Sequence, residues 1–194
     1  MLKAIIFDMD GTLVDSKLDF DAMRREMQIA ENDNILDAIR TASSPDRALE
    51  LTEILFRHEM TGAEVATLMP GIDGVLSEIE RLGLKCGVFT RNARNVTERT
   101  LEKLGLRFDR VIAREDAPPK PDPTGLLQMC VEWDCDPDEA LFIGDWHYDL
   151  DAGKRAGIRT IIYAPGNPGF DVQDATVIRD YSELVEIIAQ SIQR

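Results

Sequence analysis

Positive charge is scarce in this sequence. Its 194 residues include 22 lysines and arginines against 36 aspartates and glutamates, which gives a formal net charge of −14, and the sequence pI is about 4.5. Such a surface repels the phosphates of nucleic acids and of anionic membranes. The composition therefore argues against non-specific binding to nucleic acid or to a membrane, and it favours a protein that stays dispersed in solution.

Long hydrophobic runs and paired cysteines are also lacking. The apolar stretch near the start, within MLKAIIFDMD, is far too short for a signal peptide or a membrane span. The three cysteines, Cys86, Cys130 and Cys135, are an odd number without the spacing of metal ligands. We therefore expect reduced thiols in a cytoplasmic protein, with a secreted protein that carries an unpaired thiol as the weaker alternative.

The sequence contains no repeats, and its 44% hydrophobic content is enough for one sizeable core, or for a core with a small appended module. Several short apolar runs are continuous rather than alternating, which is typical of strands buried on both faces. These runs are 2–7, 85–90, 110–113, 140–144 and 159–164. Helical patterns are found at 72–82, 93–104, 123–133 and 149–156, and after the capping pair Asp180 and Glu183. The alternation predicts an α/β fold with a doubly wound, parallel, Rossmann-like sheet.

Residues 17–69 interrupt this alternation. They contain no convincing strand, and their patterns predict helices around 18–30, 34–42, 45–60 and 62–68. Ser44 followed by Pro45 is typical of a helix N-terminus, and Thr61 with Glu64 is typical of a capping box.

These patterns predict two domains. We expect an α/β core formed by residues 1–16 and 70–194, and a small inserted helical cap formed by residues 17–69. A cap inserted at this point would cover the carboxyl ends of the strands, where open α/β sheets bind their ligands.

Acidic and polar residues follow three of the predicted strands. The strand-end segments are Asp8-Met9-Asp10-Gly11-Thr12, Thr90-Arg91-Asn92, and Gly144-Asp145 with Asp149 four residues later, and Lys120 precedes the helix that leads to the fourth strand. Because the carboxyl ends of parallel strands meet at one rim of a sheet, we expect these side chains to converge there. Carboxylates, a hydroxyl and an ammonium group together suit a hard cation and a phosphate.

Each of these residues also has a plainer explanation when taken alone. Asp8 and Asp10 could be a turn pair, and Asp145 and Asp149 could be ordinary loop and helix-capping acids. Thr90 could be a strand-end hydroxyl, and Lys120 could be a solvated loop charge. Their expected meeting at one rim favours the functional interpretation over these alternatives.

The ordered set of motifs, DxDGT at 8–12, Thr90, Lys120 and GDxxxD at 144–149, resembles the haloacid dehalogenase superfamily of aspartate-dependent phosphohydrolases. The position of the predicted cap resembles the subgroup that includes phosphoglycolate phosphatase and β-phosphoglucomutase. The resemblance implies a Mg²⁺-dependent phosphatase that hydrolyses small phosphorylated metabolites through an aspartyl-phosphate, as a monomer or a homodimer.

The resemblance also implies a role for each motif residue. Asp8 would be the nucleophile and Asp10 the general acid and base, while Thr90 and Lys120 would hold the phosphoryl group. The further substrate-binding residues would be Gly11, Thr12, Arg91 and Asn92. The metal-binding residues would be Asp8, Asp10 through its carbonyl, Asp145, and Asp149 in support.

The sequence departs from the family pattern after Asp145. The family commonly places a small hydroxyl residue there, whereas this chain has Trp146-His147-Tyr148, which we expect to pack under the cap rather than to shape the pocket edge. We expect Phe20, with Met23 and Met27, to lie in the core of the cap. Arg91 has two open interpretations: it reaches a substrate carboxylate or second phosphate, or it forms a surface salt bridge.

There are four alternatives to a phosphatase. A phosphomutase of the same superfamily shares the core and differs in how the cap excludes water. A receiver-like signalling domain also gathers acids, a threonine and a lysine around Mg²⁺, but it explains neither the late GDxxxD nor the helical insertion. A non-catalytic binding module would leave these groups unused, and dehalogenation is disfavoured because the dehalogenases of the superfamily lack the second acid that Asp10 supplies.

Overall fold

The computed structural model describes residues 1–172 and 175–192. A six-stranded parallel sheet forms its centre, in the order β5-β4-β1-β6-β7-β8. The strands are β1 (Ala4–Phe7), β4 (Lys85–Phe89), β5 (Arg110–Ile112), β6 (Ala140–Gly144), β7 (Arg159–Tyr163) and β8 (Thr176–Ile178). The first five were predicted as strands, and β8 was not, because three residues carry too short an apolar pattern.

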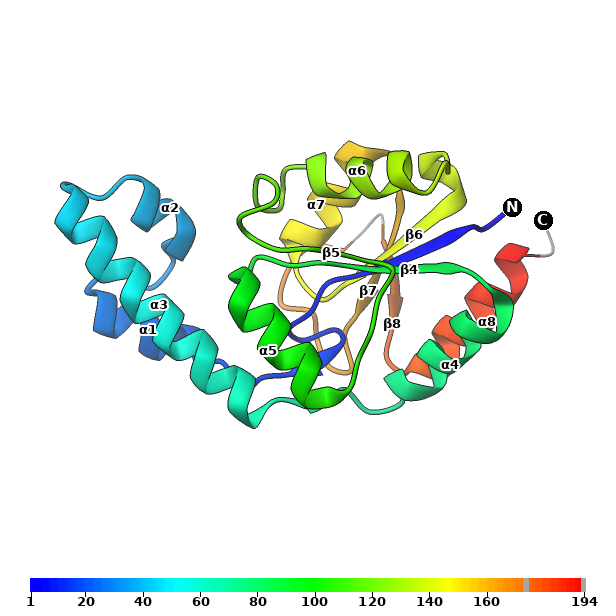
Figure 1. The fold of residues 1–194 in the computed structure, drawn as a ribbon, viewed down its shortest axis with the longest axis horizontal. Coiled ribbons are helices and arrows are strands. Elements are labelled where there is room, and N and C mark those ends of the chain that lie inside the picture. Colours follow the sequence, from blue (N-terminus) through cyan, green and yellow to red (C-terminus); the bar gives the residue numbers. More distant parts are fainter. Residues whose placement is uncertain (173–174, 193–194) are drawn as a thin grey trace.

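Helices cover both faces of the sheet (Figure 1). They are α4 (Ile72–Leu82), α5 (Arg94–Leu104), α6 (Thr124–Glu132), α7 (His147–Ala156) and α8 (Tyr181–Ile192), and a 3₁₀ turn at Pro137–Glu139 precedes β6. The predicted doubly wound α/β fold is therefore confirmed.

The two sides of β1 explain why its residues are apolar without alternation. Ile5 and Phe7 belong to the buried cluster formed with α4 and α8, whereas Ala4 and Ile6 belong to the cluster formed with α6 and α7. All four residues have no exposed surface. A strand whose neighbours are covered by helices on both faces has no solvent side and needs no polar positions.

Three helices form a separate layer beside the carboxyl ends of the strands (Figure 1). We call α1 (Phe20–Met27), α2 (Ile35–Arg40) and α3 (Pro45–Val65) the helical segment. It has its own buried apolar cluster, to which Met23, Met27 and Leu51 contribute. Met23 and Met27 therefore lie where the sequence predicted them.

The chain enters and leaves the helical segment through a short antiparallel pair, β2 (Val14–Asp15) with β3 (Thr67–Leu68). No strand was predicted within 17–69, so β3 corrects that expectation. Two residues on each strand are too few to show a period in the sequence. Because β2 and β3 lie side by side, both connections of the helical segment start at one point of the core.

The long helix α3 also differs from its prediction. Ser44 caps its start as expected, since its hydroxyl accepts a hydrogen bond from the Arg47 N–H at 3.2 Å. The helix then runs to Val65 without a break, although two helices, 45–60 and 62–68, were predicted. Thr61 caps nothing: its hydroxyl donates to the Arg57 carbonyl at 2.8 Å inside the same helix.

In the part of the chain that the structure describes, no helix is both long enough and apolar enough to cross a membrane.

Candidate active site

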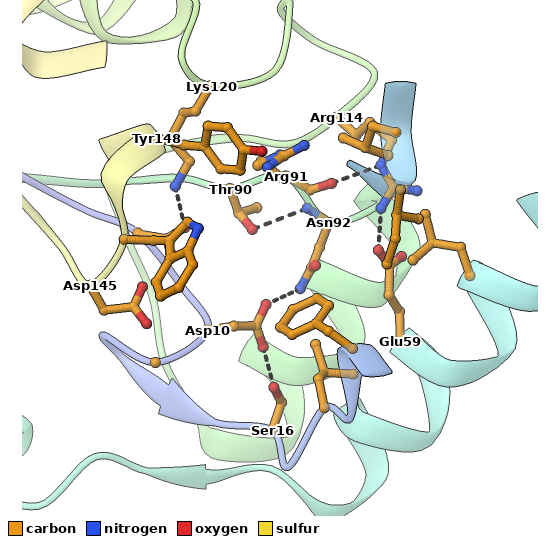
Figure 2. A pocket seen from close by; sticks show the side chains of 18 of the residues that line it. Asp10, Ser16, Glu59, Thr90, Arg91, Asn92, Arg114, Lys120, Asp145 and Tyr148 are labelled. Atoms are coloured by element: carbon orange, nitrogen blue, oxygen red, sulfur yellow. Dashed lines mark hydrogen bonds and ion pairs between the residues drawn. The ribbon is translucent and has the colours of Figure 1, made fainter. Parts of the chain in front are cut away.

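The carboxyl ends of β1, β4 and β6 open into a cavity of about 510 Å³ between the sheet and the helical segment. Figure 2 shows the side chains that point into it from these strand ends and from the helices opposite. Almost all the predicted site residues line this cavity: Asp8, Asp10, Gly11, Thr90, Arg91, Asn92, Lys120, Asp145 and Asp149. Parallel strands thus bring together residues that lie up to 141 positions apart, Asp8 and Asp149.

Thr12 lies behind the cavity wall and does not line it. It is fully buried, and its backbone carbonyl accepts a hydrogen bond from the Tyr181 hydroxyl at 2.5 Å. Its own hydroxyl has no partner among the described residues. Spacing alone could not separate Thr12 from its neighbour Gly11, which does line the cavity.

Lys120 connects two of the carboxylates. Its ammonium group lies 2.5 Å from Asp8 Oδ1 and 2.6 Å from Asp149 Oδ1, and its side chain is 2% exposed. Burial opposes the charge of Lys120, but the carboxylates of Asp149 and Asp8 outweigh this effect, so the pKa of Lys120 is raised. Lys120 is therefore a fixed cation beside Asp8.

Asp149 is held on its other side by the start of α7. Its Oδ2 accepts hydrogen bonds from the N–H groups of Trp146, at 3.0 Å, and Asp145, at 3.2 Å. These bonds satisfy donors that the first turn of a helix leaves without partners. Asp149 therefore ties the β6 loop to Lys120.

The carboxylates of Asp8, Asp145 and Asp149 form a group whose oxygens lie within 4.8 Å of one another. Burial, followed by the nearby carboxylates, raises the pKa of Asp145 to about 8. Burial also raises the pKa of Asp8 to about 7, with Lys120 acting in the opposite direction. One buried lysine does not compensate three acids, so the site has excess negative charge carried by oxygen atoms.

A divalent cation fits this arrangement. No described residue donates a hydrogen bond to the Asp145 side chain, and Gly11 leaves room for it: a Cβ atom at Gly11 would lie 2.1 Å from Asp145 Oδ2. Gly11 also has a φ of +78°, which favours glycine. Hard cations such as Mg²⁺ prefer carboxylate oxygens of this kind, so the residues present can hold one.

Asp10 has different surroundings from Asp8. The Ser16 hydroxyl donates to its Oδ1, and the Asn92 amide donates to its Oδ2 at 2.5 Å. Burial raises the pKa of Asp10, against these two hydrogen bonds. Two neighbouring acids are thus placed in unequal environments, one beside an ammonium group and one among neutral donors.

Several cavity residues were not predicted from the sequence, and most come from outside the motifs. They include Ser16, Asn34, Glu59, Arg114 and Tyr148. Glu59 lies on the buried face of α3, which also carries Leu55 and Ala63, four residues to either side. An acid on the apolar face of a helix is a signal that could have identified Glu59, whereas Asn34 carried only the signal of a helix cap.

Two aromatic residues also correct the sequence analysis. Phe20 is 48% exposed and Trp146 is 45% exposed, and both line the cavity rather than filling a core. Trp146 stands at the start of α7 and contacts Phe170 with ring centroids 5.4 Å apart. Two of the three bulky residues after Asp145, Trp146 and Tyr148, therefore shape the cavity edge.

The fold and the site define a class of enzyme. Residues 5–163 match the family model of haloacid dehalogenase-like hydrolases, and the chain belongs to this family. It is similar to the N-acetylmuramic acid 6-phosphate phosphatase of Pseudomonas aeruginosa, with 30% identity over 98% of this chain and 96% of that protein. It is also similar to the phosphoglycolate phosphatase of Aquifex aeolicus, with 28% identity over 98% of this chain and 99% of that protein.

A solved structure shares the fold. A haloacid dehalogenase-like hydrolase from Bacteroides fragilis superposes with a TM-score of 0.79 at 21% identity, covering 95% of this chain and all of that one. The match to the family model and the similar phosphatases confirm the resemblance drawn from the motifs. They also confirm the predicted enzyme class, a phosphatase of the haloacid dehalogenase-like family.

Proposed function

We propose that this protein is a Mg²⁺-dependent phosphatase that hydrolyses small phosphate monoesters through an aspartyl-phosphate on Asp8. The observation that carries the proposal is the position of Asp8, at the end of β1 and bonded to the buried ammonium group of Lys120. The same cavity holds a second acid, Asp10, and the carboxylate of Asp145, which has no hydrogen-bond donor among the described residues. The names of the similar phosphatases, which refer to small phosphorylated molecules, support the substrate class.

In the first step, a carboxylate oxygen of Asp8 attacks phosphorus, and the bond from phosphorus to the leaving oxygen breaks. Lys120 is bonded to Oδ1 of Asp8, which leaves Oδ2 for the attack. Asp10 gives its proton to the leaving alcohol oxygen. Because burial raises the pKa of Asp10, this carboxyl group retains a proton more readily than an exposed one.

In the second step, the Asp10 carboxylate takes a proton from water, whose oxygen attacks phosphorus. The bond from phosphorus to Asp8 breaks, inorganic phosphate leaves, and both acids return to their starting states. Ser16 and Asn92 keep Asp10 in place for both proton transfers. Thr90 and Lys120 bind the phosphoryl oxygens, beside the backbone of Gly11.

The metal site in this proposal consists of Asp8, Asp145 and the carbonyl of Asp10, with Asp149 in support. Mg²⁺, when bound, supplies positive charge that offsets the repulsion between the Asp8 carboxylate and the phosphate oxygens. Thr12 supports the loop from behind rather than binding substrate, because it does not line the cavity.

Residues 17–69 act as a cap on a core formed by 1–16 and 70–194 in this proposal. The helical segment supplies Asn34, Glu59 and other side chains to the cavity wall that faces the leaving group. A cytoplasmic location is supported by the absence of disulfides among the three cysteines, which are all free.

The test is phosphate release from a generic aryl phosphate with and without Mg²⁺. Asp8→Asn should abolish turnover with the fold intact, and Asp10→Asn should lower kcat by about a hundredfold or more. Asp151→Asn, on the α7 surface, is the matched control and should retain normal turnover. Near-normal turnover by Asp8→Asn would contradict the covalent mechanism, and turnover without any divalent cation would contradict the metal requirement.

A further inference from the structure

We propose that Arg91 forms an anion-binding subsite for the leaving group, so that preferred substrates carry a carboxylate or a second phosphate in addition to the phosphoryl group that is transferred. This inference rests on the proposed phosphatase function and specifies its substrate class. It begins with the charges in the cavity, where five cationic side chains form part of the wall: Lys17, Arg24, Arg91, Arg114 and Lys120.

Four of these five cations pair with a carboxylate of the protein. Arg24 lies 3.1 Å from Asp21, Lys17 pairs with Asp15, Arg114 pairs with Glu59, and Lys120 bridges Asp8 and Asp149. Among the described residues, no carboxylate lies within ion-pair distance of Arg91. In a chain with a net charge of −14, an unpaired guanidinium in a cavity is unusual. Within the described residues, Arg91 forms no surface salt bridge of the kind considered from the sequence.

Neutral groups hold Arg91 in place instead. Its guanidinium carbon lies 4.3 Å from the ring centroid of Tyr148, and its Nη2 donates to Asn34 Oδ1 at 3.0 Å. The Asn34 amide in turn donates to the Tyr148 hydroxyl at 2.8 Å. Figure 2 shows the Arg91 side chain lying beside Tyr148. These contacts orient the guanidinium without neutralising it, which lowers the entropy cost of binding an anion.

The backbone of Arg91 is fixed as well. Arg114 Nε donates to the Arg91 carbonyl at 2.7 Å, and Glu59 on α3 anchors Arg114 from the helical segment. Arg91 Nε has no protein partner, and one hydrogen bond to Asn34 is the only one that its side chain donates within the described residues. The guanidinium therefore retains donors for a ligand, next in sequence to Thr90 at the transfer site.

The remaining wall opposite the strand ends is largely apolar. Ile35, Leu36, Leu55 and Phe20 face the cavity from the helical segment. The volume of about 510 Å³ is within the range of small-molecule sites, roughly 300–1,000 Å³. An anion on the leaving group, separated from the transferred phosphoryl group by a short carbon chain, would meet the guanidinium at one point and apolar surface elsewhere.

The experiment compares matched substrates of equal size and different charge. One arm uses ω-phosphooxy carboxylic acids of increasing chain length against their primary amides. A second arm uses α,ω-diol bisphosphates against the corresponding hydroxyalkyl monophosphates, and thus separates a carboxylate from a second phosphate as the anion. The readout is the ratio of kcat/KM for the charged to the neutral member of each pair, with Mg²⁺ present.

The wild-type enzyme should prefer the charged member by about ten- to a hundredfold at the best chain length, the value of a hydrogen-bonded charge pair. Arg91→Gln should bring that ratio close to one, because it lowers kcat/KM for the charged member much more than for the neutral member. Arg24→Gln is the matched control, because it removes a paired arginine from the same cavity, and it should preserve the ratio.

Asn34→Asp provides an independent test that keeps Arg91. Aspartate caps helices as well as asparagine does, so α2 should remain folded. The new carboxylate would stand beside the guanidinium and compete with the substrate anion, so the ratio should fall. A lower ratio of kcat/KM for charged to neutral substrates in Arg91→Gln and Asn34→Asp, but not in Arg24→Gln, supports the subsite.

Other results would overturn the proposal. Absence of a charge preference in the wild type, at every chain length and in both arms, contradicts the subsite. An equal loss for charged and neutral substrates in Arg91→Gln assigns Arg91 to the transferred phosphoryl group instead. If the wild type hydrolyses none of these esters, the proposed function fails. Calorimetry with non-hydrolysable ω-phosphono carboxylic acids and their amides then tests the subsite separately. Tighter binding of the acids than of the amides, lost in Arg91→Gln, supports the subsite, and equal binding of both overturns it.

Discussion

Asp145 lies among negative charges, and within the described residues no donor of the protein is bonded to its carboxylate. Its carboxylate lies near those of Asp8 and Asp149, receives no hydrogen bond from a described residue, and fills the space that Gly11 leaves open. Lys120 is bonded to the other two acids but not to Asp145. A cation bound here would therefore depend on Asp145 more than on any acid outside the cavity.

We predict that Asp145→Asn weakens Mg²⁺ binding strongly and stabilises the metal-free protein above neutral pH. The folded-state pKa of Asp145, about 8, lies above its ordinary value near 4. Between these two values the folded chain retains a proton that the unfolded chain has lost, so the stability of the metal-free protein falls as pH rises through this window. Asparagine carries no such penalty.

Calorimetric titration with Mg²⁺ and denaturant unfolding in a chelator measure the two effects. The free energies of unfolding of the wild type and Asp145→Asn should differ less at pH 5 than at pH 8.5. At pH 8.5, Asp145→Asn should be more stable by at least ~1 kcal/mol. Asp151→Asn should match the wild type in both measurements. An unchanged Mg²⁺ affinity in Asp145→Asn would mean that the metal site lies elsewhere.

At the scale of elements, α3 carries a glycine with a definite packing role. A Cβ atom at Gly62 would lie 2.8 Å from Leu18 Cδ2 and 3.0 Å from the Ser16 carbonyl, so α3 approaches the chain that enters the helical segment very closely. Gly74 in α4 is also inside a helix, but nothing lies within 4 Å of a Cβ atom there. The two glycines therefore form a matched pair.

We predict different effects on stability for the two alanine variants. Gly74→Ala should stabilise the protein by about 0.5–1 kcal/mol, since alanine loses less entropy in a helix, and raise Tm by about 2–4 °C per kcal/mol. Gly62→Ala should not show this gain in stability, because the new methyl group would clash with the Ser16 carbonyl. Because Ser16 also positions Asp10, the turnover of Gly62→Ala should fall as well.

Thermal unfolding and phosphate release are the two measurements. Gly74→Ala should retain wild-type turnover. Equal stabilisation by both substitutions would show that α3 can move away from Ser16 without cost, and would contradict the role assigned to Gly62.

At the scale of the molecule, the acidic surface and the helical segment act together on the substrate. A net charge of −14 repels phosphate monoesters at long range, so capture depends on the local cations of the cavity. In the proposed function, Lys120 binds the phosphoryl group, which every monoester shares. In the proposed function, discrimination among monoesters arises where Arg91 and the helical segment face the leaving group.

We predict that replacing residues 18–68 by a short flexible linker spares some activity on a small aryl phosphate but largely removes preferences among metabolites. The cavity loses its helical wall, including Asn34 and Glu59, while the strand-end groups remain. The measurement is the ratio of kcat/KM for two or three good metabolites before and after the replacement, with circular dichroism to verify the fold. Preserved ratios would place substrate choice in the core.

The sequence by itself determined the elements whose signal is local. Continuous apolar runs indicated the first five strands of the sheet, because burial on both faces removes polar positions. The order of the motifs indicated the site, because parallel strands bring Asp8, Thr90 and Asp145 to one rim regardless of how side chains pack. It also indicated where the helical segment is inserted.

Only the tertiary structure decided which side chains face the cavity and which charges are paired. Gly11 lines the cavity while Thr12 lies behind it. Arg91 has no carboxylate partner among the described residues, while Arg114 is bound to Glu59, 55 residues away. The unbroken course of α3 likewise places Glu59 in the cavity wall. Such pairings join residues that are distant in sequence, and they depend on packing distances of a few ångströms, which neither periodicity nor spacing encodes.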